Sequence, residues 1–125
     1  MDCIAFDESD ADQLNSVQTS AGRIIAVSSA SIYCDEKGRT LDEARKCGFP
    51  DFPIPIREDH ATVAPGPETY STRKIAMERR LLDQAGDRTT ILRPAAIHGP
   101  RSKHAREWWF VRRLLDGRRR IPLVH

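Results

Sequence analysis

Hydrophobic positions along the first part of the chain alternate between continuous runs and helically spaced ones. Residues 3–6 form a short apolar run that ends in acidic residues, which suits the end of a buried strand. Residues 23–27 form a longer run with three β-branched members, and residues 11–20 between the two runs place Leu14 and Val17 at helical spacing. A run that is apolar on both faces is typical of a central parallel strand, so the order predicts a right-handed strand–helix–strand crossover.

The same two patterns return in the second half of the chain. Residues 68–85 are predicted to be helical, because Met77 and Leu81 lie four positions apart and Gly86 follows as a stop signal. Residues 89–92, Thr-Thr-Ile-Leu, are predicted to form a third strand. Alternating strands and helices indicate an α/β domain with a parallel sheet.

Two further segments complete the pattern. Residues 33–67 contain five prolines and three glycines and are predicted to form a long irregular excursion, of the kind that lines or covers a site. A last helix is expected over residues 105–116, with Trp108, Val111 and Leu115 on one face. Trp108, Trp109 and Phe110 fit this helical pattern, and core is the interpretation we favour for them.

Composition narrows the class of protein. The 125 residues suffice for one domain, and the 39% of hydrophobic and 30% of charged residues are ordinary for a soluble globular chain. No apolar run approaches the roughly 20 residues that cross a membrane, and no signal peptide is visible, so we expect no membrane association. Three cysteines at no metal-like spacing favour neither a disulfide framework nor a zinc site. A reducing, cytoplasmic compartment fits best.

Charge is unevenly distributed although the net charge is only +2. Residues 2–12 carry five acidic side chains and no basic one, whereas the chain from Arg101 onward is rich in arginine. A basic tail can bind nucleic acid, a membrane surface or a diphosphate. A solvated face of a helix and loop is the interpretation we favour, and we do not expect a nucleic acid partner, because Trp108 and Trp109 fit a helical pattern.

Parallel sheets bind ligands at the carboxyl ends of their strands, so the residues after Val27 and after Leu92 are the first candidates for a site. Ser28 and Ser29 come directly after the strand that ends at Val27, and Tyr70 and Lys74 share one face of the following helix. A neighbouring ammonium favours the phenolate form of a tyrosine, and a phenolate can accept a proton from a substrate hydroxyl. A serine hydroxyl can hold the same substrate oxygen in place.

Three segments together resemble the extended short-chain dehydrogenase/reductases, the NAD-dependent epimerase/dehydratase group. They are residues 27–33 (Val-Ser-Ser-Ala-Ser-Ile-Tyr), residues 70–78 (Tyr-Ser-Thr-Arg-Lys with Glu78) and residues 92–100 (Leu-Arg-Pro through Gly-Pro). Glu58 precedes the second segment. The resemblance covers roughly residues 1–100 and implies part of a Rossmann-like, doubly wound parallel sheet.

The resemblance also implies roles for individual residues. Ser29, with Ser28 as the near alternative, would be the catalytic serine, Tyr70 the general acid/base, and Lys74 the partner that favours the phenolate and binds the nicotinamide ribose. The cofactor, NAD or NADP, would contact Ser28, Tyr70 and Lys74 and the turn formed by Arg93, Pro94, Ala95 and Ala96. The substrate would be a small molecule, for example a nucleotide sugar, and no metal is implied.

The chain departs from the family in its glycines. No two of the seven are spaced as Gly-x-Gly or Gly-x-x-Gly, so we expect the Gly-rich strand–helix–strand unit that binds the pyrophosphate to be missing. Residues 1–120 would then be the C-terminal half of an NAD(P)-binding domain, and residues 121–125 the start of a truncated substrate lobe. A catalytically silent binding or regulatory module of the same fold is the alternative function, and we expect the isolated chain to aggregate or form a homo-oligomer.

Overall fold

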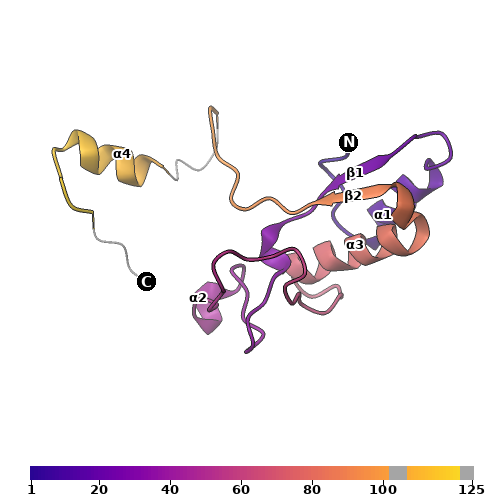
Figure 1. Cartoon of the computed structure of the whole chain (residues 1–125), viewed down its shortest axis with the longest axis horizontal. Coiled ribbons are helices and arrows are strands. Elements are labelled where there is room, and N and C mark those ends of the chain that lie inside the picture. The colour runs from indigo at the N-terminus through magenta and orange to yellow at the C-terminus, as the bar shows by residue number, and fades with distance from the viewer. Residues whose placement is uncertain (102–106, 122–125) are drawn as a thin grey trace. The chain divides into compact units, whose positions relative to one another are not determined.

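A computed structural model describes residues 1–101 and 107–121 of the chain (Figure 1). The chain divides into two compact units, Met1–Ala95 and Ala96–His125. The first unit holds most of the regular structure. Of the predicted substrate-lobe segment 121–125, residues 122–125 lie outside the described part.

The first unit is built from two helices and two parallel strands, joined by shorter helical turns. Its elements, in chain order, are α1 (Glu8–Ser16), β1 (Ile24–Val27), the 3₁₀ turn η1 (Ala30–Ile32), α2 (Ala44–Cys47), α3 (Tyr70–Ala85), the 3₁₀ turn η2 (Gly86–Arg88) and β2 (Thr89–Leu92). The strands β1 and β2 pair in parallel, with Ile24 beside Thr89 and Val27 beside Leu92. The first unit therefore has an α/β fold, and the strands predicted at residues 23–27 and 89–92 are confirmed.

The strand expected at residues 3–6 is wrong. In the described chain this part of the backbone pairs with β1 only at Asp2, whose N–H donates to Ile25 O at 2.7 Å and whose carbonyl accepts from Val27 N at 3.0 Å. The carboxylate of Asp2 then accepts hydrogen bonds from Ile4 N and Ala5 N, at 2.9 and 2.6 Å. This local side-chain pairing competes with the sheet for the same N–H groups and turns the chain out of the strand.

The core lies between the two strands and the two longer helices, which occupy the same side of the sheet in Figure 1. The fully packed cluster consists of Ala5, Ala11, Ala26, Met77 and Leu81, with Leu14 and Ile91 against it. Three alanines in this cluster let α1 and α3 approach the strands closely. The opposite face of the strands is less covered, since Ile25 and Val27 are half-buried and Leu92 is exposed.

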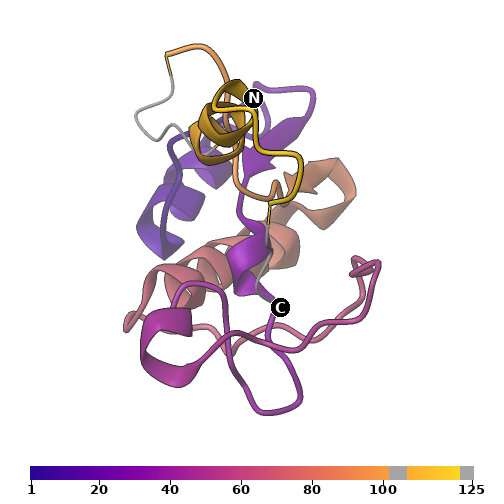
Figure 2. The ribbon, with the colours of Figure 1, turned by 90° about the vertical axis from the view of Figure 1, so that its left-hand side faces the viewer.

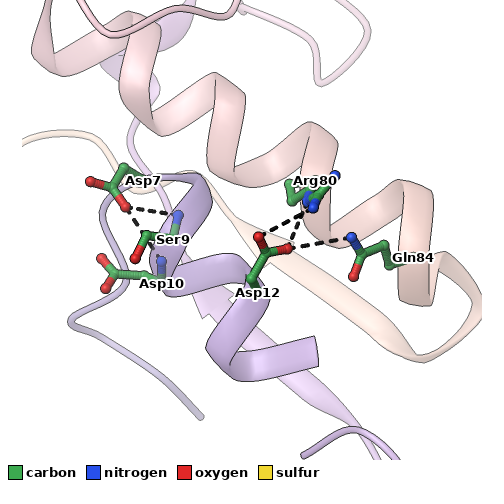
Figure 3. Close-up of polar contacts among 6 residues, drawn as sticks. All are labelled: Asp7, Ser9, Asp10, Asp12, Arg80 and Gln84. Carbon is green, nitrogen blue, oxygen red and sulfur yellow. Dashed lines mark hydrogen bonds and ion pairs between the residues drawn. The ribbon is translucent and has the colours of Figure 1, made fainter. Parts of the chain in front are cut away.

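Polar contacts on the surface join α1 to α3 (Figure 3). Asp12 of α1 accepts from Arg80 Nε at 2.6 Å and Nη2 at 3.2 Å, and from Gln84 Nε2 at 3.4 Å. At the start of α1, the N-cap Asp7 accepts from the N–H groups of Ser9 and Asp10. The Asp12–Arg80 pair is solvent-exposed, so water and salt screen it and it contributes little beside the buried apolar cluster.

The long excursion leaves the sheet beyond the carboxyl end of β1 (Figures 1 and 2). It is tied back where Tyr33 forms an antiparallel bridge with Thr62, and where Val63 N donates to Ile32 O at 2.9 Å. Its prolines and glycines leave room only for the short helix α2 between these points. The predicted irregular excursion over residues 33–67 is confirmed apart from that helix.

The second unit contains α4 (Trp108–Leu115), which is shorter than the expected helix. Of that expectation, residues 105–106 lie outside the described part. The core expected at Trp108, Trp109 and Phe110 is wrong, because all three side chains are exposed. Val111 and Leu115, on the face predicted with Trp108, are exposed as well. No other helix or strand is described within residues 96–101 and 107–121, so among these residues the apolar face of α4 has no second element to pack against.

A membrane-crossing helix is not found within residues 1–101 and 107–121, where every helix is too short or too polar for that role. Helix α4 has eight residues, whereas a helix that crosses a bilayer needs roughly 20.

Two adjacent leucines of α3 test the position of the core. Leu81 is fully buried, whereas Leu82 is 42% exposed. We expect Leu81→Ala to lower the free energy of unfolding by about 2–5 kcal/mol and Leu82→Ala, the matched control, by about 1 kcal/mol or less. Urea denaturation of the 125-residue chain measures both. Equal losses would contradict the helix orientation.

Candidate functional site

The serine segment after β1 is fastened to the segment after β2. Ser28 N donates to Leu92 O at 2.7 Å, which extends the parallel pairing by one step, and Ala30 N donates to Pro94 O at 2.9 Å. The two predicted site segments therefore lie side by side at the carboxyl ends of the strands, where parallel sheets bind ligands.

The two candidate serines differ in their surroundings. Ser28 is buried, and its Oγ has no hydrogen-bond partner among the described residues. Ser29 is half-buried and is the N-cap of η1; its Oγ accepts from Ser31 N at 3.2 Å and from the Ser31 hydroxyl at 3.0 Å. A buried hydroxyl without a partner is costly, which makes the Ser28 side chain a candidate to bind a ligand.

Tyr70 is the first residue of α3 because a capping box starts the helix there. The side chain of Thr69 accepts from Thr72 N at 3.1 Å, and Thr69 N donates to the Thr72 hydroxyl at 2.8 Å. The Tyr70 side chain is 40% exposed, and its ring packs against Phe6 with the centroids 5.6 Å apart. Tyr70 is therefore held at a helix end with one side open to solvent.

Lys74 lies one turn further along α3, and only 5% of it is exposed. Its Nζ donates to Ala5 O at 2.6 Å and to Val27 O at 3.1 Å. The same nitrogen lies 5.8 Å from the centroid of the Phe6 ring and 6.0 Å from that of Tyr70. Lys74 thus joins the residue just before Ser28 to the helix that carries Tyr70.

Burial and charge act on Lys74 in opposite directions. Removal from water lowers the pKa of its ammonium, and the carboxylates of Asp2, Asp10 and Glu78 partly offset that effect. An ammonium has three N–H donors, and the two carbonyls occupy two of them. One donor remains for a ligand.

Arg93 is engaged with other protein groups rather than free. Its guanidinium forms an ion pair with Glu78, with Nη2 2.7 Å from Oε2, and also donates to Tyr33 Oη at 3.1 Å and to Glu58 O at 2.9 Å. The Glu78 side chain is almost fully buried. Burial alone would lower the pKa of Arg93, but the hydrogen bonds to Glu78 and Tyr33 outweigh it and raise the pKa.

The remaining residues of the predicted cofactor turn are spread over the two units. Pro94 is half-buried and holds Ala30 through its carbonyl, and Ala95 is exposed. Ala96 begins the second unit. A groove of about 650 Å³ beside β2 includes Arg93 and Ala95 in its lining, whereas Ser29, Tyr70 and Lys74 do not line it.

The structure thus brings the Lys74 ammonium to the main chain directly before Ser28 and Ser29, and Tyr70 lies one turn earlier on the same helix. No role was predicted from the sequence for Phe6, whose ring lies against Tyr70 and near the Lys74 ammonium. None was predicted for Ser31 and Ser71, which are hydrogen-bonded to each other near Ser29. Ser71 shares the buried stripe of α3 with Lys74 and Glu78. Polar residues at helical spacing within an apolar stripe were the available signal.

The excursion carries a second polar cluster, centred on the buried Asp35. Its carboxylate accepts from the N–H groups of Lys37, Arg39 and Asp51 at 3.0, 2.9 and 3.1 Å, and from Arg39 Nε at 2.8 Å. Burial alone would raise the pKa of Asp35, but these hydrogen bonds outweigh it and hold the pKa far below its usual range. Asp35 therefore organises the loop from residue 35 to residue 51.

Metal chemistry has no candidate centre within residues 1–101 and 107–121, where no three His, Cys, Asp or Glu side chains cluster. Cys3 and Cys47 are free and exposed, and Cys34 is free and buried. Burial, together with the charge of Asp35, raises the pKa of the Cys34 thiol, which disfavours the reactive thiolate.

Comparisons with protein-family models, with curated proteins and with solved structures found no match to this chain. What the fold itself defines is the broad class: a mixed α/β protein whose first unit has a two-stranded parallel sheet with helices packed against it. The polar residues gathered at the carboxyl ends of these strands are the candidate site.

The Arg93–Glu78 pair is open to a double-mutant cycle. We expect Arg93→Met to lower the free energy of unfolding by about 3 kcal/mol, because it leaves the buried Glu78 carboxylate without its partner. The double variant Arg93→Met/Glu78→Leu should recover more than half of that loss. The exposed Arg57–Asp59 pair is the control, and its coupling energy should be much smaller because solvent screens the two charges. If the losses of unfolding free energy from the two single variants simply added in the double variant, Arg93 and Glu78 would not be coupled as an ion pair.

The lowered pKa of Asp35 in the folded chain should make stability depend on pH. Its pKa is lower in the folded than in the unfolded chain, so its contribution is present above the unfolded pKa of about 3.9 and is lost as pH falls below it. We expect Asp35→Asn to be less stable than the parent chain at pH 7, with a difference that shrinks below about pH 4. Urea midpoints over this range measure it. Asp59→Asn, at an exposed ion pair, is the control and should change the urea midpoint little at any pH. If Asp35→Asn lowered the midpoint equally at all pH values, the Asp35 carboxylate would not be the source of the pH dependence.

Proposed function

We propose that this chain carries the catalytic half of a NAD(P)-dependent epimerase, dehydratase or reductase built on a Rossmann-like parallel sheet. The observation that carries the proposal is the position of Lys74, whose buried Nζ reaches the carbonyl of Val27, directly before Ser28 and Ser29. Tyr70 lies one turn earlier on the same helix. This position supports a site in which a serine, a tyrosine and a lysine would act together at the edge of the sheet where ligands bind.

In this proposal the side chains divide the acid–base work. Tyr70 accepts a proton from a substrate hydroxyl, or returns one to a carbonyl, and its partly exposed side chain is open to a substrate. Ser29 holds the same substrate oxygen. A bound nicotinamide would supply the redox chemistry, and the chain fits its ribose end through the spare N–H of Lys74 and the unpaired hydroxyl of Ser28.

The proposed substrate is a small molecule with a secondary hydroxyl or carbonyl carbon, and a nucleotide sugar is one candidate. Free, exposed Cys3 and Cys47 suit a reducing compartment, so the proposed place of action is the cytoplasm. The proposal covers NAD and NADP alike, because the residues it uses would bind the nicotinamide ribose, which the two cofactors share.

A catalytically silent module of the same fold is the second candidate. The observation that favours it is that both cations near the site already have protein partners: Lys74 is bonded to two main-chain carbonyls, and Arg93 to Glu78, Tyr33 and Glu58. Those contacts stabilise the fold whether or not a cofactor binds. In this reading the chain keeps the shape of the site and serves binding or regulation.

Titration of NADH and NADPH into the purified 125-residue chain, followed by fluorescence, separates the two candidates. We expect saturable binding of one nucleotide, weakened about 10-fold or more by Lys74→Met, because a hydrogen bond to a charged group contributes about 1.5–3 kcal/mol. Lys37→Met, at an exposed lysine, is the control and should bind as the parent does. Tyr70→Phe keeps the ring that packs on Phe6 and should bind NADH or NADPH as the parent does. With NAD⁺ or NADP⁺ supplied as the hydride acceptor, the same variant should fail to oxidise UDP-glucose, the probe substrate.

Circular dichroism decides how a negative result is interpreted. No saturable binding by a folded parent chain favours the silent module. Binding that Lys74→Met and Lys37→Met reduce equally would mean that the nucleotide binds elsewhere through general charge, and would count against the proposed site.

A further inference from the structure

Three serine side chains form a continuous chain of hydrogen bonds beside the candidate site. The Ser31 hydroxyl donates to Ser29 Oγ at 3.0 Å. The Ser71 hydroxyl donates to Ser31 O at 2.9 Å and lies 3.3 Å from Ser31 Oγ. Ser71 belongs to α3 and Ser29 and Ser31 to the turn after β1, so the chain joins two elements that are 40 residues apart in sequence.

The two hydrogen bonds that Ser29 accepts limit its remaining hydrogen-bonding capacity. A serine hydroxyl has two lone pairs and one proton. The Oγ of Ser29 accepts from Ser31 N at 3.2 Å and from the Ser31 hydroxyl at 3.0 Å, and these two bonds occupy both lone pairs. The only unused capacity of Ser29 is its own O–H, which can donate.

Ser71 fixes the orientation of this arrangement. It is only 1% exposed, so its hydroxyl depends on Ser31 for a partner, and an unpaired buried hydroxyl would be costly. Ser71 is also the immediate neighbour of Tyr70 in the first turn of α3. The contact between Ser71 and Ser31 therefore sets the rotation of the helix turn that carries Tyr70 relative to the turn that carries Ser29.

We propose that Ser31 and Ser71 are positioning residues that make Ser29 a hydrogen-bond donor only. This inference rests on the proposed function. Ser29 then donates to the substrate oxygen both when that oxygen is a hydroxyl and when it is a carbonyl, and it keeps its proton throughout. The proton that leaves a substrate hydroxyl then goes to Tyr70 and not to Ser29.

A thiol placed at position 29 tests the hydrogen bonds without any cofactor. In a background lacking the natural cysteines (Cys3→Ser, Cys34→Ala, Cys47→Ser), Ser29→Cys introduces one sulfur that receives the two bonds from Ser31. Hydrogen bonds to the anionic form favour it, so the pH profile of alkylation by iodoacetamide should give a thiol pKa below the ordinary value of about 8.5. Adding Ser31→Ala should raise that pKa by about half a unit or more.

Further variants separate positioning from general stability. Ser31→Thr keeps the hydroxyl and should restore the low pKa, and Ser71→Ala should raise it by a smaller amount, because it acts through Ser31. Ser16→Ala, on the exposed surface of α1, is the control and should leave the pKa unchanged. A folded Ser31→Ala variant with the same thiol pKa as its parent would overturn the inference.

The outcome also distinguishes this inference from the proposed function. If the thiol responds to Ser31→Ala and the parent chain binds NADH, both stand. If the thiol responds but the folded parent chain binds neither NADH nor NADPH, the hydrogen-bond chain is upheld and the nicotinamide chemistry is what fails. If NADH binds but the thiol does not respond, the site stands and the positioning roles of Ser31 and Ser71 fall.

Discussion

The buried ammonium of Lys74 is the interaction on which the arrangement of the first unit depends. An ion that loses its water must find strong acceptors, and here the acceptors are the carbonyls of Ala5 and Val27. Those two carbonyls belong to neighbouring segments of the chain, and the lysine belongs to the helix that crosses them. The distance of α3 from the strands, and with it the position of Tyr70, follows from satisfying one charge.

The buried stripe of α3 repeats this principle twice more. Ser71, Lys74 and Glu78 lie on it among apolar residues, and each reaches a different part of the unit: Ser71 the turn at Ser31, Lys74 the end of β1, and Glu78 the guanidinium of Arg93. Methionine and leucine at the same helix face supply the apolar contacts of the core. The helix is therefore fastened to three elements by polar groups whose partners are specific, in addition to apolar packing, which is not directional.

Local signals in the sequence were enough for some elements and not for others. The β-branched run that ends at Val27 and the Thr-Thr-Ile-Leu segment predicted both strands, and helical spacing with a following glycine predicted α3. The strand expected at residues 3–6 failed because the Asp2 carboxylate captures two N–H groups. The partners of Arg93 and Ser71 lie 15 to 60 residues away, and no local pattern contains such distances. The helical period of α4 was visible, but the period alone does not say whether an apolar face has a partner.

The two carbonyls bound by Lys74 have a consequence for any molecule that enters the site. At this point the N-terminal segment and β1 have separated, and the ammonium cross-links them in place of the hydrogen bonds that a continuous sheet would have. Because the ammonium keeps a third N–H, a ligand can bind to it while both carbonyl bonds stay in place. The ammonium would then hold three groups at once, two from the protein and one from the ligand, so a bound ligand should keep the N-terminal segment and the end of β1 together.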